Sequence, residues 1–589
     1  MTHSFLVGLT QRLRSTGNHQ LPEEMGRDLS RPNVCFGSKA DIVARRAKIH
    51  NGDMGRTLMA LLVLLALGSA AIAKGPPVKE LYGGGYGKPG AFTYTQIELE
   101  RKGTTYSGKI HQPYDRTDTP PAKHLSVVGN RLRFTAGGTR YDLKRTAIGL
   151  EGSARLAGGR ILAAFFVLRP GSPPAELLKR LEGSFDLGNG RILTLSRNND
   201  SGGFWYVDLP SGRTGFLYNI SDYEFIAGPC LYCAGPERLR VRFDQRGGPG
   251  KTRQVSVRAG AKDRIAPRLR GYREEEVRFP SADGTRLAGS LFIPAGGSKY
   301  PAVVLVHGSG GQTRNGYYGH IRFLAEAYAR RGIAAFAYDK RGTGESGGDY
   351  DKAGFAVLAD DASAALRYLS ARRDINADRL GLSGASQAGW LVPMAATRFP
   401  TVKTLQIRSG SAPMGVEESE RRRLERQMRA DGFGSRQIEE AMRVRMLMDE
   451  YARTGTGWPA LTASANPVKN EYWMNKYIGS LPARDSSDWP WLREAFSYDV
   501  QSDFARYSGR WQILFGGTDA LIDPALVVPL VRQALASGAA EEVSIKVLPK
   551  ATHNGFEGKS GGEKEFPGLS RFVPHYFDEI VDWAAQRLR

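Results

Sequence analysis

The pattern of apolar and polar residues changes character at about residue 270. Before that point, segments such as 94–103 (YTQIELERKG) and 125–138 (LSVVGNRLRFTAGG) alternate apolar and polar residues, and Gly-rich turns separate them. This alternation is the period-two pattern of half-buried strands. Beyond it, residues 301–308 (PAVVLVHG) form a continuous apolar run, typical of a parallel strand covered on both faces. The sequence therefore predicts an all-β N-terminal region followed by an α/β region.

The all-β region is predicted to hold two β-rich modules, at 74–175 and 176–270. The second opens with LEGSFDLGNGRILTLSR, in which Asn189-Gly190 separates two strand-like runs, a strong hairpin signal. We expect each module to be a small β sandwich or barrel. Neither contains a cluster of paired carboxylates or histidines, so we expect structural roles for His111 and His124 and no chemistry of their own from these strands.

From residue 271 onward, apolar strands alternate with helical patterns, which predicts a doubly wound, mostly parallel α/β sheet. The alternation stops at 413–509 and resumes at Trp511. We therefore assign the α/β domain to 271–412 and 510–589, and the interruption to a helical lid inserted at the carboxyl edge of the sheet. The aromatic residues of this insertion either line a site for an apolar or aromatic substrate or form the core of the lid; they are Trp458, Tyr472, Trp473, Tyr477, Trp489 and Trp491.

Residues 54–73 have the pattern of a secretory signal peptide. Arg56 supplies a basic start, 58–67 is an unbroken apolar run, and Ala71-Ile72-Ala73 is a cleavage signal made of small residues. The apolar run is too short to span a bilayer. We expect cleavage after Ala73 and a periplasmic or secreted protein. The polar, aperiodic residues 1–53 that precede it are interpreted as an upstream gene-start artefact.

Cysteine content and charge narrow the function classes. Beyond residue 73 only Cys230 and Cys233 remain, too few for a structural zinc site. Their GPCLYCAGP setting favours a disulfide-pinned loop over free thiols or a redox centre, because a redox CxxC normally opens a helix. The net charge is +22, of which residues 1–73 hold +4. This charge is scattered and accompanies no nucleic-acid motif, so we expect no nucleic-acid partner; an anionic envelope surface remains an alternative.

The stretch LGLSGASQAGW, 380–390, contains the candidate nucleophile. Ser386 stands between an apolar strand and a helical pattern, with Gly384 two residues before it and Ala388 two residues after. In a G-x-S-x-G elbow the serine sits on a sharp strand-to-helix turn that only small neighbours allow. Here the last glycine is replaced by alanine. From this stretch alone, an ordinary helix N-cap serine remains an alternative.

Two later loops supply the partners that a serine nucleophile needs, a base and a carboxylate that orients it. His553 follows the strand VSIKVL, and Asp519 follows the strand WQILFGG. The order Ser, Asp, His is the one that α/β-hydrolases require. Asp523 competes with Asp519, but it adjoins Pro524, where a helix is expected to start, so a capping role suits it better.

Donors for an oxyanion are expected from two backbone segments. The glycine-rich loop HGSGG at 307–311 follows the first parallel strand and offers the N–H of Ser309, with Gly308 as the alternative. The second donor is the N–H of Gln387, directly after the nucleophile. His307 is interpreted as a structural loop residue. His320 and His575 fall within helical patterns, where surface or packing roles are expected.

This combination of motifs resembles the α/β-hydrolase superfamily, in particular bacterial hydrolases related to the prolyl oligopeptidase and dienelactone hydrolase groups. The motifs VLVHGSGG, AYDKRGTGESGG, LSGASQAGWLVPMAA, LFGGTDALIDP and LPKATHNGF occur in the expected order within 271–589. The resemblance implies hydrolysis of an ester or amide through an acyl-enzyme, without metal or cofactor. It also implies that Asp339 and Arg341 are structural residues at the edge of the site.

The sequence thus favours an exported serine esterase, similar to carboxylesterases, that acts on a small-molecule ester. One alternative is a serine peptidase of the prolyl oligopeptidase type acting on short peptides, since a long β region can restrict access to a site. The strands show no repeat at the period of propeller blades, however. Another alternative is a non-catalytic envelope-binding protein that keeps the hydrolase fold and binds through its basic β modules.

Overall fold

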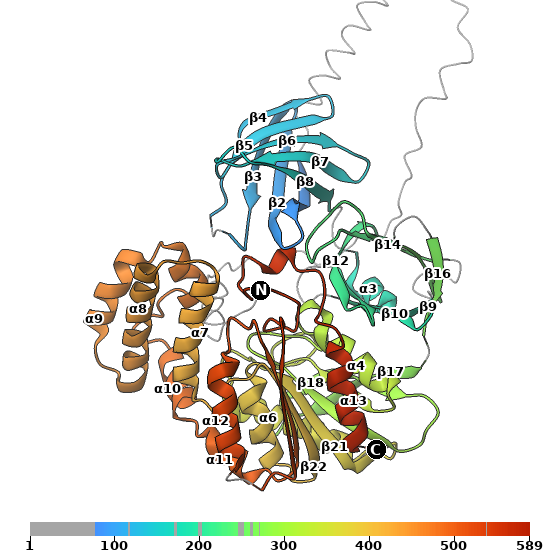
Figure 1. The fold of residues 1–589 in the computed structure, drawn as a ribbon, viewed down its shortest axis with the longest axis vertical. Coiled ribbons are helices and arrows are strands. Elements are labelled where there is room, and N and C mark those ends of the chain that lie inside the picture. Colours follow the sequence, from blue (N-terminus) through green and yellow to red (C-terminus); the bar gives the residue numbers. More distant parts are fainter. Residues whose placement is uncertain are drawn as a thin grey trace, which may run out of the picture.

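The computed structural model describes residues 77–588 except 116–117, 170–172, 198–202, 246–252, 260–262, 270 and 537–538. The expected signal peptide at 54–73 and the residues before it lie outside this range. Three sheets of eight strands each organise the described chain (Figure 1). Within the described residues, no helix combines the length and apolar character needed to cross a membrane.

The first sheet closes on itself as an antiparallel barrel. Each strand pairs with its neighbour in the chain except β3 with β4, and β1 also pairs with β8. The ring closes where Ile110 N donates to Pro120 O (3.1 Å) and Ala122 N to Gly108 O (2.7 Å). Apolar side chains such as Tyr141 and Phe134 fill the interior. The strands are β1 (Val78–Lys88), β2 (Ala91–Lys102), β3 (Thr105–His111), β4 (Lys123–Val128), β5 (Arg131–Ala136), β6 (Thr139–Arg145), β7 (Gly149–Arg155) and β8 (Ile161–Leu168).

The second sheet forms a similar antiparallel ring, closed where Leu269 N donates to Ser184 O (2.8 Å). The predicted all-β N-terminal region is therefore confirmed, and its sheets are antiparallel. One short helix, α3 (Ala175–Leu181), was not expected within it, and it forms because Leu178 and Leu181 lie on one helical face that packs into this barrel's core. The strands are β9 (Gly183–Gly188), β10 (Arg191–Arg197), β11 (Phe204–Leu209), β12 (Arg213–Ser221), β13 (Glu224–Ala227), β14 (Leu239–Phe243), β15 (Gln254–Arg258) and β16 (Asp263–Pro267).

The third sheet has the strand order β17-β18-β20-β19-β21-β22-β23-β24. Strand β18 pairs antiparallel with β17 and β20, and the other pairs are parallel. The strands are β17 (Tyr272–Pro280), β18 (Arg286–Pro294), β19 (Tyr300–Val306), β20 (Ala334–Tyr338), β21 (Ile375–Ala385), β22 (Val402–Arg408), β23 (Arg510–Gly516) and β24 (Glu542–Leu548).

Helices cover both faces of this sheet and bury two apolar cores. Helices α4 (His320–Arg330) and α13 (Tyr576–Leu588) pack into one core. Helices α5 (Phe355–Ser370), α6 (Ala388–Thr397) and α12 (Pro524–Ala536) pack into the other. Because the parallel strands run in one direction, their carboxyl ends gather the following loops at a single edge.

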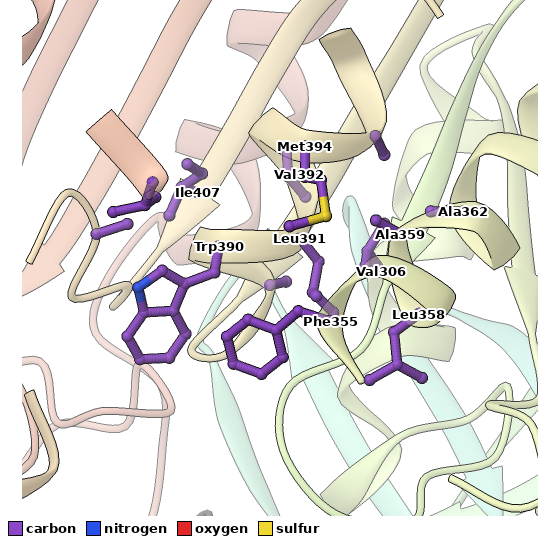
Figure 2. Packing of buried hydrophobic residues seen from close by; sticks show 14 of the residues in the cluster. Val306, Phe355, Leu358, Ala359, Ala362, Trp390, Leu391, Val392, Met394 and Ile407 are labelled. Carbon is purple, nitrogen blue, oxygen red and sulfur yellow. The ribbon is translucent and has the colours of Figure 1, made fainter. Parts of the chain in front are cut away.

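Helix α6 packs against both the sheet and α5 on the same face, and Figure 2 shows its Trp390 beside Phe355 of α5, whose rings stack with centroids 5.6 Å apart. All its residues from Ala388 to Ala396 are buried. A Cβ on Gly384 would lie 2.3 Å from the Cβ of Ala388. The missing side chain at Gly384 therefore leaves room for the alanine that breaks the usual elbow pattern.

The interruption in the α/β alternation is a helical insertion between β22 and β23, seen beside the sheet in Figure 1. Its residues join the core on the α5–α6 side of the sheet. The insertion contains α7 (Val416–Ala430), α8 (Ser435–Thr454), α9 (Trp458–Ala465), short turns η2 (Asn466–Val468) and η3 (Met474–Ile478), α10 (Asp488–Ser497) and α11 (Val500–Arg506).

Candidate active site

Ser386 occupies a strained turn between β21 and α6. Its φ is 57°, a left-handed conformation that few non-glycine residues adopt. The backbone holds it there, because its N–H donates to Arg408 O (2.9 Å) and its carbonyl accepts from Gly389 N (2.8 Å). Gln387, not Ser386, is the N-cap residue of α6, and no side chain caps that helix. The N-cap interpretation of Ser386 is therefore wrong.

Asp519 and His553 are joined by a hydrogen bond. His553 Nδ1 lies 2.9 Å from Asp519 Oδ2 and 3.2 Å from Oδ1. The Asp519 side chain is only 1% exposed, and its Oδ1 also accepts from Leu521 N (2.8 Å) and Ile522 N (3.0 Å). A carboxylate held in this way fixes the imidazole with a proton on Nδ1 and leaves Nε2 to accept one.

Asp523, the competing carboxylate, has a different role. Its Oδ1 accepts from Ala525 N (3.0 Å) at the start of α12, and its Oδ2 pairs with Arg426 (2.9 Å). These contacts agree with the predicted capping role. Arg426 also donates from Nη2 to Asp519 O (2.8 Å), so helix α7 of the insertion braces the loop that carries Asp519.

Ser386, Ser309 and His553 line one narrow cavity of about 80 Å³, with Asp519 hydrogen-bonded to His553. The side chain of Gln387 points elsewhere, to Lys340. The structure thus brings together residues from four separate loops. The other lining residues are Val306, Gly308, Gln312, Tyr317, Tyr318, His320, Ile321, Ala385, Arg408, Leu521, Asn554 and Phe556.

Lys340 fixes the conformation of the glycine-rich loop at 307–311 through hydrogen bonds. Its Nζ donates to Gly308 O (2.9 Å), Gly310 O (3.1 Å) and Gln387 Oε1 (3.0 Å), and burial lowers its pKa to about 7. Gln312 Nε2 in turn donates to Ser309 O (2.9 Å). Over the described residues, the N–H groups of Ser309 and Gln387 have no backbone acceptor. The loop carbonyls are thus tied down while these two donors stay available.

Sequence reasoning missed two pocket residues, His320 and Arg408. His320 was expected to have a packing or surface role, but it lines the cavity. Burial and the nearby charge of Arg408 lower the pKa of His320 to about 3, so the His320 imidazole is neutral at physiological pH. Arg408 is 5% exposed. A charged residue at the carboxyl end of the apolar strand VKTLQIR was the available signal.

The remaining sequence candidates lie outside the cavity. His307 is buried against the Tyr338 ring, and burial with the nearby Lys340 charge lowers its pKa to about 3, which agrees with a structural role. Asp339 forms a buried ion pair with Arg314 (2.7 Å), and Arg341 pairs with Asp361 (2.6 Å). These two pairs brace the loop between β20 and α5.

Both barrels contact the long loop that follows His553. Gly90 N, in the β1–β2 turn, donates to Gly568 O (2.9 Å), and Leu231 N donates to Leu569 O (2.6 Å). Leu231 sits inside the disulfide-closed loop Cys230–Cys233, the pairing that the sequence favoured. The ring of Trp205 lies 5.1 Å from that of Tyr318, a pocket residue. The barrels therefore form part of the surroundings of the site.

None of the six aromatic residues named in the insertion lines the cavity of Ser386. They belong to, or pack against, the large core on the α5–α6 side of the sheet. Of the two alternatives for these aromatic residues, the structure supports packing in the core and does not support the lining of a substrate site. Across the described residues, no group of His, Cys, Asp and Glu side chains has an arrangement that could hold a metal ion.

Comparisons with known proteins support the hydrolase resemblance. Residues 283–465 match the model of the X-Pro dipeptidyl-peptidase (S15) family, about a third of this chain. The uncharacterized protein PA2218 of Pseudomonas aeruginosa is 31% identical over 133 residues, which is 22% of this chain and 34% of that protein. The uncharacterized protein YfhR of Escherichia coli K12 is 36% identical over 121 residues, 20% of this chain and 39% of that protein. The matches thus span little more than a third of these relatives.

Solved structures similar to this chain include that of PA2218, with TM-score 0.34 and 18% identity over 54% of this chain and 95% of that one. Ferulic acid-bound Est1E from Butyrivibrio proteoclasticus has TM-score 0.33 and 16% identity, over 53% and 97%. Dienelactone hydrolase from Anabaena variabilis has TM-score 0.30 and 16% identity, over 54% and 97%. The family match at residues 283–465 alone confirms the predicted resemblance to the α/β-hydrolase superfamily.

Proposed function

We propose that this chain, a relative of the serine hydrolases of the α/β-hydrolase superfamily, is a carboxylesterase-like enzyme that works through a covalent acyl-enzyme. The observation that carries the proposal is the joint placement of two groups in one cavity. Ser386 is held in a left-handed turn, and His553, oriented by the buried Asp519, lines the same cavity. Strained serines next to an oriented imidazole are typical of this chemistry.

In this mechanism Ser386 Oγ attacks the ester carbonyl while His553 Nε2 takes its proton. The carbonyl oxygen becomes an oxyanion that accepts hydrogen bonds from the N–H groups of Ser309 and Gln387. When the tetrahedral intermediate collapses, the bond to the leaving alcohol breaks and His553 returns the proton to that alcohol. Water then attacks the acyl-enzyme by the same sequence and releases the acid. Asp519 stabilises the imidazolium at both stages.

An ester is favoured over a peptide by the charges around the cavity. A dipeptidyl-peptidase has to bind a positively charged amino terminus, for which a carboxylate is the usual partner. The residues that line this cavity include Arg408 and no Asp or Glu. Glu563 lines an adjoining small pocket that shares His553, and it is paired there with Lys476 (3.3 Å). The family match to a dipeptidyl-peptidase model keeps peptide hydrolysis as the second candidate. A purely envelope-binding protein has less support, because it needs neither the strained Ser386 nor the Asp519–His553 pair.

The remaining parts of the proposal concern location and access. The signal peptide at 54–73 would export the protein to the periplasm or beyond. The helical insertion at 413–509 would act as a lid, since it begins after β22 at the same edge of the sheet and Arg426 ties it to Asp519. The substrate is a small-molecule ester. The positive net charge of the chain would suit an anionic envelope surface as a partner. We expect no nucleic-acid partner.

The activity test compares two substrate families on one protein preparation. The protein from Lys74 onward is assayed with p-nitrophenyl esters and with aminoacyl- and X-Pro-p-nitroanilides, alongside Ser386→Ala as the matched control. We expect ester hydrolysis that the Ser386→Ala variant lacks, and anilide turnover that is far slower. Anilide turnover faster than ester turnover would favour the peptidase. Equal rates for wild type and Ser386→Ala on every substrate would overturn the proposal.

A further inference from the structure

Arg408 differs from every other buried arginine in the described chain. Six arginines are buried there, and five of them pair with carboxylates: Arg314, Arg322, Arg341, Arg423 and Arg445. Arg408 alone has no Asp or Glu oxygen within 4 Å among the described residues. A buried charge without a counter-ion is costly, so proteins rarely keep one without a use for it.

The groups around the Arg408 guanidinium are all neutral at physiological pH. Its Nη1 donates to Ser383 Oγ (2.7 Å), and its Nε is buried without a hydrogen-bond partner. Burial raises the pKa of Tyr328 to about 12, and burial also raises that of Tyr576, so both phenols stay protonated beside it. His320, with a pKa lowered to about 3, is uncharged as well. The positive charge is therefore left uncompensated.

Arg408 is also directly beside the nucleophile. It ends β22, pairs in register with Ala385, and its carbonyl accepts the hydrogen bond from Ser386 N (2.9 Å). Arg408 is one of the residues that line the same cavity as Ser386 and His553. His320 Nε2, buried and without a partner, lines this cavity too, at the N-terminus of α4, whose first turn has no acidic residue. A helix N-terminus adds positive potential.

We propose that Arg408 binds a carboxylate carried by the substrate, at the end of a short acyl chain attached to the ester. The preferred substrates would be monoesters of short dicarboxylic acids. A carboxylate matches the planar guanidinium better than any neutral group, and it supplies the missing counter-charge. The cavity of about 80 Å³ limits the chain to a few carbon atoms. This inference rests on the proposed function, because it identifies the substrate class of that same site.

The binding test uses the Ser386→Ala protein, which removes the attacking hydroxyl, so that affinity is measured without turnover. Calorimetry compares monomethyl glutarate with methyl pentanoate, an ester of similar length without the carboxylate. We expect the glutarate monoester to bind about tenfold or more tightly, as is usual for hydrogen bonds to a charged group. Adding Arg408→Met should abolish the difference, and Arg408→Lys should restore part of it. Adding Arg238→Met, an exposed arginine beside a separate cavity, should leave it unchanged.

The outcomes separate this inference from the proposed function. Equal affinity for both esters, or a preference that survives Arg408→Met, overturns the role of Arg408. If Arg408→Met fails to fold, the two ligands are compared on Ser386→Ala and on Ser386→Ala with Arg408→Lys. A preference for the glutarate monoester that is equally strong in both proteins would overturn the role of Arg408. Hydrolysis of neutral p-nitrophenyl esters by the wild type, without preference for p-nitrophenyl hemiglutarate, would leave the esterase standing and remove the carboxylate subsite.

Discussion

The barrels and the α/β region each contain eight-stranded sheets, but they bury different kinds of residue. The barrel interiors are filled by apolar side chains, and their buried acids, Glu182 and Asp208, are each paired with an arginine, Arg197 or Arg191. The α/β region buries charged groups close to the carboxyl edge of its sheet, among them Asp519, Lys340 and Arg408. Buried charges gathered at one edge of a sheet are typical of functional sites.

The contrast also shows how the two parts cooperate. The barrels contribute no residue to the cavity around Ser386, yet they pack against the residues that form its wall. Trp205 contacts Tyr318, and turns from both barrels hydrogen-bond to the loop that follows His553. The barrels therefore act as supports, and changes in them should affect activity only through these contacts.

The largest effect is expected from removing the nucleophile or the base. Ser386→Ala or His553→Ala should lower kcat for ester hydrolysis by about 10⁶-fold, because the two residues act as a unit. The thermal unfolding temperature should stay close to that of the wild type, because an alanine substitution removes only side-chain atoms and leaves the strained backbone turn in place. Steady-state kinetics with calorimetry on the same samples measures both. An Ala variant with more than a few per cent of wild-type kcat would contradict the mechanism.

The next effect separates the two neighbouring carboxylates. Asp519→Asn should lower kcat by about 10⁴-fold, because the imidazole then loses the carboxylate that fixes its tautomer. Asp523→Asn, four residues away, should keep kcat, because an amide oxygen caps α12 about as well as a carboxylate. It should lose at most about 1 kcal/mol of unfolding free energy, through the weakened pairing with Arg426. The pair is assayed side by side. A larger loss of kcat in Asp523→Asn would exchange the assigned roles.

A third comparison uses the two barrels themselves. Trp205→Ala and Phe134→Ala each remove a fully buried ring and should cost about 3–5 kcal/mol of unfolding free energy. Phe134 lies in the interior of the first barrel, and Trp205 lies in the core that the second barrel shares with α4 and α13. Only Trp205 packs on the pocket residue Tyr318. We expect kcat/KM to fall about tenfold in Trp205→Ala through a displaced pocket wall, and to stay at the wild-type value in Phe134→Ala. Equal kinetics in the two variants would show that the barrels do not shape the pocket.

The smallest effect concerns the buried lysine beneath the glycine-rich loop. Burial lowers the pKa of Lys340 to about 7, so between pH 7 and 10 the unfolded chain binds a proton that the folded chain does not. The contribution of Lys340 to the unfolding free energy must therefore rise with pH, by about 2 kcal/mol between pH 7 and 9. Lys340→Met removes this dependence. Denaturant titrations of both proteins at the two pH values give the difference, and parallel pH dependences would contradict the assigned pKa.

Much of this architecture could be predicted because local patterns dictate it. Continuous apolar strands and period-two alternation placed the two kinds of sheet, and the loop positions of Ser386, Asp519 and His553 followed from the strands before them. Helix α3 was missed because seven residues, with only Leu178 and Leu181 buried on one face, give too weak a periodicity. Ring closure of the second barrel depends on long-range pairing, that of Leu269 with Ser184, which no local pattern records.

The presence of Arg408 and His320 in the cavity of Ser386 could not be predicted for a different reason. Arg408 and His320 meet only when β22 and the start of α4 come together beneath Ser386, although they lie 88 residues apart in the chain. The sequence shows a strand that ends in arginine and a helix that begins near histidine. It does not show that no carboxylate accompanies them. The absence of a carboxylate partner for Arg408 among the described residues is a property of three-dimensional packing, which no local pattern in the sequence records.

The most direct test of the central claim is covalent labelling of the nucleophile. The protein from Lys74 onward is treated with a fluorophosphonate, digested, and the adduct located by peptide mass spectrometry. The account predicts one adduct per chain, on Ser386, with labelling abolished by Ser386→Ala and slowed by His553→Ala because the base is gone. An unlabelled wild type beside a labelled control hydrolase, or an adduct on a different serine, would contradict it.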